Sequence, residues 1–134
     1  KGLSKLLGDT FTHITPDDGL LDDQLNDFYV DADGTFWIAS GSWSQLNGGV
    51  THYNGTTFRH YQSTDSLAAN AVNAIFKDRE GVMWFGTTAG LSRFDGDTFT
   101  NFTTSDGLPS NFINPGAITQ SIDGRLWFGT AQQS

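Results

Sequence analysis

Two short segments of this chain carry the residues best suited to hold a ligand. Residues 39–49 combine an indole ring with side-chain amides, and residues 111–116 combine a phenyl ring with side-chain amides. Aromatic rings stack on the C–H faces of sugars, and amides make directional hydrogen bonds to hydroxyls, so this chemistry favours a small polar ligand such as an oligosaccharide. Ordinary surface loops are an equally good interpretation. The candidate ligand-binding residues are Trp43, Gln45, Asn47, Asn111, Phe112 and Asn114.

The histidine and acidic residues form no catalytic or metal-binding pattern. No Ser-His-Asp, His-Glu-x-x-His or phosphate-loop spacing is present, and we expect the three histidines to be solvated. Residues 31–34 (DADG) resemble the start of a calcium loop, but the chain turns straight into a strand, which favours a hairpin turn. Glu80, the only glutamate, is expected at a turn on the opposite face from the candidate residues, which weakens a lyase hypothesis. We therefore expect no enzymatic activity, no metal and no cofactor.

Composition narrows the class of protein. The 134 residues include 16 glycines and 13% aromatic residues, which is typical of a turn-rich all-β protein. A net charge of −8 repels phosphate groups and argues against binding to nucleic acid or an anionic membrane. The absence of cysteine excludes disulfides and thiolate metal sites. No apolar run approaches the roughly 20 residues of a membrane span, so we expect no membrane insertion of this segment.

The elements that must position the candidate residues repeat along the chain. Tryptophan follows an acidic-Gly turn three times, at spacings of 47 and 43 residues: Trp37, Trp84 and Trp127. Phenylalanine follows a Gly in the same way at Phe11, Phe58 and Phe99. Because each set holds one position of the repeat among apolar neighbours, we assign both sets to the core rather than to ligand stacking.

The clearest copy, residues 70–99 and just beyond, predicts four strands. They are expected at residues 72–77, 82–87, 91–94 and 98–102, separated by Gly-containing turns. A period of roughly 40 to 45 residues with four strands is typical of a β-propeller blade. A β-sandwich of unrelated strands would not reproduce the same turn and Trp positions three times.

The predicted fold is an all-β β-propeller built from four-stranded antiparallel blades. If the strands of a blade are called A to D, the first residues copy strands C and D, and the last copy strands A and B. The chain then contains three blade equivalents with one blade split between its ends. The expected units are a C–D half-blade at 1–15, blades at 16–62 and 63–104, and an A–B half-blade at 105–134.

Three blades are too few to close a ring, since propellers have about four to eight. Open faces and unpaired strand edges are also a liability that natural proteins cover. We therefore expect two chains to join head to tail, as a homodimer that closes a six-bladed ring. A piece of a larger single-chain propeller is the competing interpretation.

The two candidate segments are the places where the copies differ. Relative to the second copy, the first has six extra residues between strands B and C, and the third has two extra residues in the link from D to A. Both junctions emerge on one face of a propeller, around the mouth of the central channel. Function on a regular scaffold tends to lie in such irregular loops.

The copies resemble the two-component regulator propeller repeat. The resemblance rests on Met83-Trp84-Phe85-Gly86-Thr87 and Gly90-Leu91-Ser92-Arg93-Phe94 in the second copy, and on Leu126-Trp127-Phe128-Gly129-Thr130 in the third. It implies an origin in the extracytoplasmic, periplasmic sensor region of bacterial hybrid histidine kinases, which often sense glycans. The wider fold neighbourhood includes a streptogramin lyase.

The function we expect is that of a non-enzymatic recognition or sensor module with its ligand at the channel mouth. A self-assembling propeller scaffold or fragment without a ligand is one alternative. A lyase-type propeller enzyme is another.

Overall fold

The computed structural model describes residues 1–42, 44 and 47–132. Two candidate residues, Trp43 and Gln45, lie outside the described residues. The described chain folds into strands joined by tight turns and by three short 3-10 helices: η1 (Pro16–Asp18), η2 (Ser63–Asp65) and η3 (Thr104–Asp106). The prediction of an all-β protein is confirmed.

Two four-stranded antiparallel sheets form the middle of the molecule, each with its strands in sequence order. The first contains β3 (Leu25–Val30), β4 (Phe36–Ser40), β5 (Gly49–Tyr53) and β6 (Phe58–Tyr61). The second contains β7 (Val72–Lys77), β8 (Met83–Thr87), β9 (Gly90–Phe94) and β10 (Phe99–Phe102). The strands predicted from the clearest copy are confirmed to within one residue at each end.

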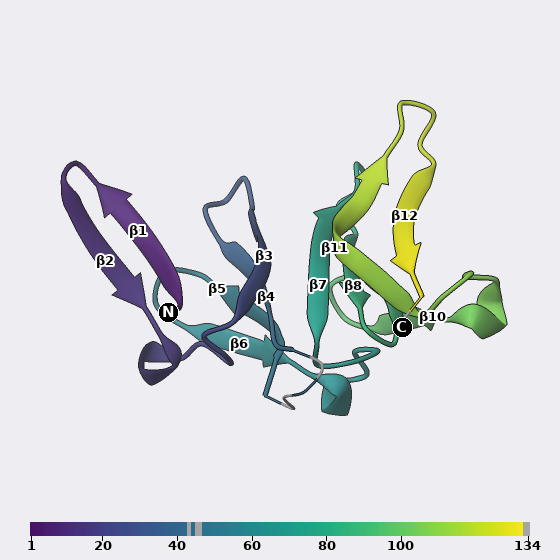
Figure 1. Cartoon of the computed structure of the whole chain (residues 1–134). Helices are drawn as coiled ribbons and strands as arrows, with labels where there is room; N and C mark the ends of the chain where they lie inside the picture. Colours follow the sequence, from purple (N-terminus) through teal and green to yellow (C-terminus); the bar gives the residue numbers. More distant parts are fainter. Residues whose placement is uncertain (43, 45–46, 133–134) are drawn as a thin grey trace.

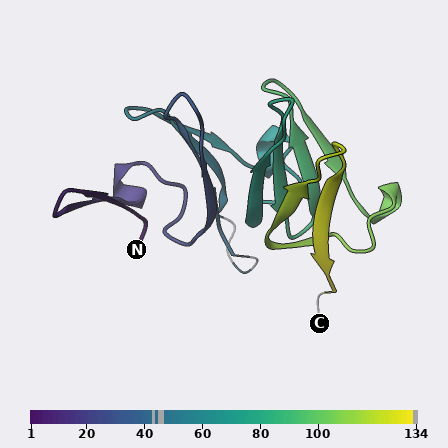
Figure 2. The ribbon, with the colours of Figure 1, turned by 90° about the horizontal axis from the view of Figure 1, so that it is seen from above.

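A two-stranded hairpin lies at each end of the row of sheets. The first pairs β1 (Leu3–Leu7) with β2 (Thr10–Ile14), and the second pairs β11 (Phe112–Gln120) with β12 (Leu126–Ala131). The four units follow one another in space in the order of the sequence (Figures 1 and 2). The first strands of the last three units, β3, β7 and β11, contact one another and form the inner row.

The antiparallel order separates two ends of the sheets. One end, which we call the junction end, contains the links between units and the β4–β5 and β8–β9 connections. The other end, with the tight turns 31–35, 54–57, 78–82, 95–98 and 121–125, is the turn end. The turn at 31–35 is closed by hydrogen bonds from Asp31 N to Thr35 O (2.8 Å) and from Gly34 N to Asp31 O (2.9 Å). The hairpin-turn interpretation of DADG is confirmed.

The hydrophobic core of the described residues consists of two clusters, one between the two four-stranded sheets and one between the second sheet and the β11–β12 hairpin. Trp37 packs between the two four-stranded sheets, and Trp84 packs between the second sheet and the β11–β12 hairpin. Phe58 is half-buried and belongs to neither cluster. The assignment to the core is wrong for two further members of the repeated sets in the single chain: Trp127 is 57% exposed and Phe11 is 61% exposed. Each lies on a terminal hairpin whose outer face has no neighbouring sheet.

The two extra residues of the third copy lie inside a strand, which corrects their expected place in a link. In β7, one residue separates Val72 and Ala74 at a bulge opposite β8. In β11, the register shift falls between Ile113 and Ile118, so the bulge is two residues longer. The insertion therefore enlarges a feature of the inner row.

Candidate functional site

The link and loop segments of neighbouring units meet at the junction end. The Asn26 side chain donates to Gly41 O at 2.7 Å, which ties the start of β3 to the end of β4. The Gln62 Nε2 atom donates to Gly48 O at 2.9 Å. Gly48 also lies so close to Asn70 that a Cβ atom would stand 2.4 Å from the Asn70 carbonyl oxygen. The expectation that both kinds of junction share one face is confirmed.

Asparagines at one position of the inner row bind the next unit. Asn26 Nδ2 donates to Val72 O at 2.8 Å, and Asn73 Nδ2 donates to Ile113 O at 2.9 Å. The candidate residue Asn114 holds the same position in β11. Among the described residues its half-buried side chain has no hydrogen-bond partner. Of the three asparagines, Asn114 is therefore the one whose amide is available to a ligand or to a further unit.

The residues after Asn114 make the enlarged bulge an exposed feature of the inner row. Pro115 and Gly116 are both exposed. Gly116 adopts a φ of 64°, and a Cβ atom added to it would meet nothing within 4 Å. This is a left-handed conformation that glycine adopts without strain. The bulge thus presents backbone groups beside the amide of Asn114.

The other described candidates occupy less open positions. Asn111 Oδ1 accepts from Thr104 N at 2.7 Å, as Asn70 Oδ1 accepts from Ser63 N at 2.7 Å in the preceding link. This oxygen closes the turn around η3, so the group of Asn111 that is most available to a ligand is its amide nitrogen. Phe112 is half-buried at the start of β11, and Asn47 is exposed on the β4–β5 connection.

Sequence reasoning missed an acidic residue at the junction end. Asp22 Oδ1 accepts from Gln24 N at 2.9 Å, but Oδ2 is buried without a hydrogen-bond partner among the described residues. A buried carboxylate oxygen without a donor is unfavourable, so it points to a partner outside these residues. The next three residues, with Lys1, line a cavity of about 410 Å³. The signal was weak because Asp22-Asp23 has no counterpart in the other copies.

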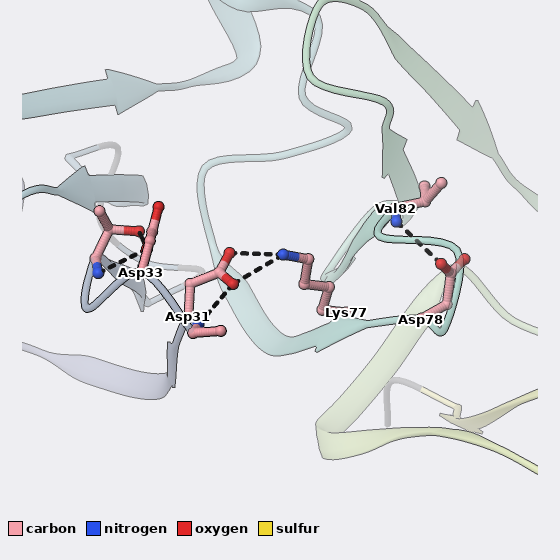
Figure 3. Close-up of polar contacts among 7 residues, drawn as sticks. Asp31, Asp33, Lys77, Asp78 and Val82 are labelled. Carbon is pink, nitrogen blue, oxygen red and sulfur yellow. Dashed lines mark hydrogen bonds and ion pairs between the residues drawn. The ribbon is translucent and has the colours of Figure 1, made fainter.

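The turn end is occupied by interactions that join the units. Lys77 Nζ lies 2.7 and 2.9 Å from the two carboxylate oxygens of Asp31, and this pair bridges the two four-stranded sheets (Figure 3). The hydrogen bond to Asp31 raises the pKa of Lys77. Asp33 accepts from Thr35 N and Oγ1 within its own turn. Both carboxylates of the DADG motif thus have protein donors.

Asp78 occupies the equivalent turn of the second sheet. It accepts from Trp84 Nε1 at 2.8 Å and from Val82 N at 2.9 Å (Figure 3). Burial alone would raise the pKa of Asp78, but the donors from Trp84, Val82 and Glu80 outweigh it, and the pKa is lowered. Its carboxylate holds the turn and the indole ring in place.

The histidines have structural partners, which corrects part of the expectation that they are simply solvated. His52 is half-buried and stacks on Trp37, with 4.1 Å between ring centroids. His13 and His60 are exposed, but each ring contacts a hydroxyl on the paired strand, Ser4 at 2.9 Å and Thr51 at 3.2 Å. No group of three potential metal ligands occurs among the described residues.

Four-stranded antiparallel units packed side by side around an inner row of strands define the chain as a propeller-type repeat protein. Residues 66–89 and 107–132 match the family model described as two component regulator propeller. The resemblance seen in the sequence is therefore confirmed for these two segments. No curated protein sequence matches the chain.

Two solved structures with a similar fold come from B. thetaiotaomicron. One is described as the extracellular domain of the hybrid two component system BT3049, with 21% identity over 89% of this chain and a TM-score of 0.75. The other is that of BT4673, with 24% identity over 81% of this chain and a TM-score of 0.65. The chain covers 16% of the length of each, and at this identity the likeness establishes the fold. None of the described helices is long and apolar enough to span a membrane.

Proposed function

We propose that the chain is a non-enzymatic recognition module of an extracytoplasmic two-component sensor, with a small polar ligand bound at the junction end. The observation that carries the proposal is the enlarged bulge of β11, which places Asn114 and the exposed backbone of Pro115 and Gly116 on the inner row. The other irregular segment begins and ends at Gly41 and Gly48 on the same end. Two departures from the repeat thus converge on one face.

The ligand class follows from the side chains available there. Asn47, Asn111 and Asn114 provide amide groups, and the cavity beside Asp22 is lined by the charged and polar residues Lys1, Asp23 and Gln24. Such groups suit hydroxyl-rich molecules, because each hydroxyl both donates and accepts hydrogen bonds. With Trp43 as a stacking ring, an oligosaccharide is the ligand we propose.

The module we propose is a ring. The hairpins 1–15 and 105–134 are taken as the C–D and A–B halves of one blade, on either side of complete blades at 16–62 and 63–104. Two copies of the chain then form a six-bladed ring with a closed two-fold axis. The exposed Trp127 and Phe11 side chains support this arrangement, because the complete blades of the other copy would cover them.

The alternative of a scaffold without a ligand is supported by the same exposed faces, and binding measurements separate the two. A lyase is not proposed, because Glu80 is exposed in the turn after β7, at the opposite end from Asn114.

The test is binding of the labelled chain to an oligosaccharide array, followed by calorimetry on the glycans retained. We expect Trp43→Ala to weaken binding by about tenfold, the effect of losing one aromatic stacking contact. Asn114→Ala is expected to weaken it by about threefold to tenfold, the effect of losing one hydrogen bond. Glu80→Ala, at the turn end, is the matched control and should bind like the unchanged chain.

Two results would count against the proposal. If the folded dimer retains no glycan on the array, the scaffold interpretation replaces carbohydrate recognition. If a glycan binds but both variants bind it as tightly as the control does, the ligand site lies elsewhere.

A further inference from the structure

One apolar cavity of the chain lies where a further pair of strands would pack. It has a volume of about 260 Å³ and is bordered mainly by aromatic and leucine side chains. They come from the face of the second sheet that carries Trp84, from the link after η3 and from β12: Trp84, Leu91, Phe102, Leu108 and Phe128. The edge of β12 away from β11 pairs with no described strand.

A matching apolar surface lies at the other end of the molecule. Leu6 in β1 and Phe11 in β2 are directly opposite each other in the hairpin, and they are 56% and 61% exposed. Two large neighbouring apolar side chains on one hairpin face are unusual on a free surface. Together they form an apolar ridge that a complementary hollow would bury.

The interface between the two complete sheets shows how such a ridge is buried. Phe94 in β9 lies 6.0 Å from Trp37 and 5.1 Å from Tyr61, measured between ring centroids. Phe99 in β10 lies 4.6 Å from Phe94 and 5.7 Å from Tyr61. The second sheet thus places two side chains of its outer strands against the Trp-bearing face of the first.

Because the units are repeats, this interface predicts which side chains would fill the cavity. Leu6 and Phe11 hold the positions of Phe94 and Phe99, while Trp84 and Phe102 hold those of Trp37 and Tyr61. We propose that the β1–β2 hairpin of a second copy docks beside β12 and fills the cavity with Leu6 and Phe11. The inference rests on the ring proposed above and specifies its contact surface.

Strand pairing gives the register. In the complete sheets Trp84 pairs with Arg93 and Trp37 pairs with His52. The same register places Trp127 opposite Lys5 of the second copy, and it gives the free edge of β12 backbone partners by strand addition. Because side chains alternate between faces, a slip of one residue would turn Leu6 and Phe11 away from the cavity.

The inner row supports the same partner independently. Asn26 and Asn73 each donate to the residue that precedes the equivalent asparagine of the next unit, Val72 and Ile113. Continued once more, the series directs Asn114 to the carbonyl of Leu25 in the second copy. One amide hydrogen of Asn114 is used in this way, so its Oδ1 and other hydrogen remain for the proposed ligand.

Cross-linking tests the register. The chain has no cysteine, so two introduced thiols are the only ones present. We expect Lys5→Cys combined with Trp127→Cys to give a covalent dimer under mild oxidation, visible on a non-reducing gel. Thr119 pairs with Trp127 one strand further in. Lys5→Cys combined with Thr119→Cys is therefore the matched control and should not cross-link, since disulfides need Cα atoms closer than about 7 Å.

Sedimentation tests the cavity. We expect Phe11→Ala to weaken dimerisation at least about tenfold, and Leu6→Ala to weaken it by a similar factor, because each empties part of the cavity. Leu7→Ala is the matched control. Leu7 is 73% exposed and lies on the opposite face of the same strand, so its loss should change the dissociation constant less than about twofold.

Any one of three outcomes would overturn the docking proposal. The first is that the unchanged chain remains a monomer at all concentrations, and the second is that Phe11→Ala dimerises as tightly as Leu7→Ala. The third is that the Thr119 control cross-links as fast as the Trp127 pair. Failure to bind glycans leaves the docking proposal intact, so the two proposals fail separately.

Discussion

The interior interface and the terminal hairpins use the same repeat positions with opposite results. Phe94 and Leu6 hold equivalent positions, yet Phe94 is 4% exposed and Leu6 is 56% exposed. Trp84 and Trp127 are equivalent, yet the first is 9% exposed and the second 57%. The difference does not come from the residues but from the presence of a neighbouring sheet. In such a chain, burial is a property of the contact between units.

This comparison predicts where stability resides. Each unit contacts only its neighbours, so the free energy of unfolding is approximately a sum over units and interfaces. The sheet formed by β7 to β10 is covered on both sides, by the first sheet and by β11–β12. It should therefore be the most sensitive part of the chain to substitution.

The largest effect is expected from Phe85, which is completely buried at the centre of this sheet. Phe85→Ala should lower the free energy of unfolding by about 3–5 kcal/mol, because it removes a large side chain and leaves a cavity. Phe11→Ala, at an exposed terminal position, should lower it by less than about 0.5 kcal/mol in the monomer.

Urea denaturation at a protein concentration that favours the monomer measures both changes. Phe85→Leu is the milder variant if the alanine variant is too unstable to purify. Equal losses for Phe85→Ala and Phe11→Ala would contradict the assignment of stability to the doubly covered sheet.

The next effect concerns a glycine that lets two units approach closely. A Cβ atom on Gly86 would stand 2.4 Å from Ile113 Cγ2, so Gly86→Ala should destabilise the chain by about 1–3 kcal/mol. At the first interface Ala39 holds the position of Gly86, and Val72 holds that of Ile113. The larger alanine is thus accompanied by a valine, which is smaller than isoleucine. Adding Ile113→Val to Gly86→Ala should therefore restore part of the loss. A double-mutant cycle measures the coupling, and purely additive changes would contradict the proposed packing.

A smaller effect separates two asparagines of the inner row. Asn73→Ala should lower the free energy of unfolding by about 1–2 kcal/mol, because Ile113 O loses its donor in a buried setting. Asn114→Ala should change it by less than about 0.5 kcal/mol in the monomer, since no described group bonds to this side chain. Thermal unfolding of the two variants side by side checks the ranking, and an equal or larger loss for Asn114→Ala would refute it.

Much of the fold could be predicted because each copy of the repeat can be compared with the other copies. The positions of Trp37 and Trp84 fixed the strands, and the Gly-containing turns fixed their ends. The exposure of Trp127 could not be predicted from its position in the repeat, because the sequence does not show whether another sheet packs on the outer face of the β11–β12 hairpin. The place of Pro115 and Gly116 was also missed, since a bulge and a longer link have the same length in an alignment.

For the candidate site, the sequence identified the right end of the molecule but not the role of each residue. Asn111 looked open, yet its oxygen closes a turn as that of Asn70 does. Asp22 escaped notice because carboxylates are normally solvated, and only the structure shows its buried oxygen.

The smallest expected effect is a dependence on pH that arises at His60. His60 is exposed as a residue, but partial desolvation of its ring lowers its pKa below the usual value of 6.5, and a hydrogen bond with the backbone of Gly19 only partly offsets this. Below pH 6.5 the unfolded chain therefore binds more protons at this residue than the folded chain does. The contribution of His60 to the free energy of unfolding is complete above that pH and declines as the pH falls. His60→Asn should remove this decline, because Asn101 holds the equivalent position with hydrogen bonds to Ser92 Oγ at 2.7 Å and to Ser66 O at 2.8 Å. Urea denaturation at about pH 8 and about pH 5 measures this decline. Between the two pH values the free energy of unfolding should fall less for His60→Asn than for the unchanged chain, and some decline should remain because both proteins retain His52. An equal decline in both would assign the acid sensitivity to other groups.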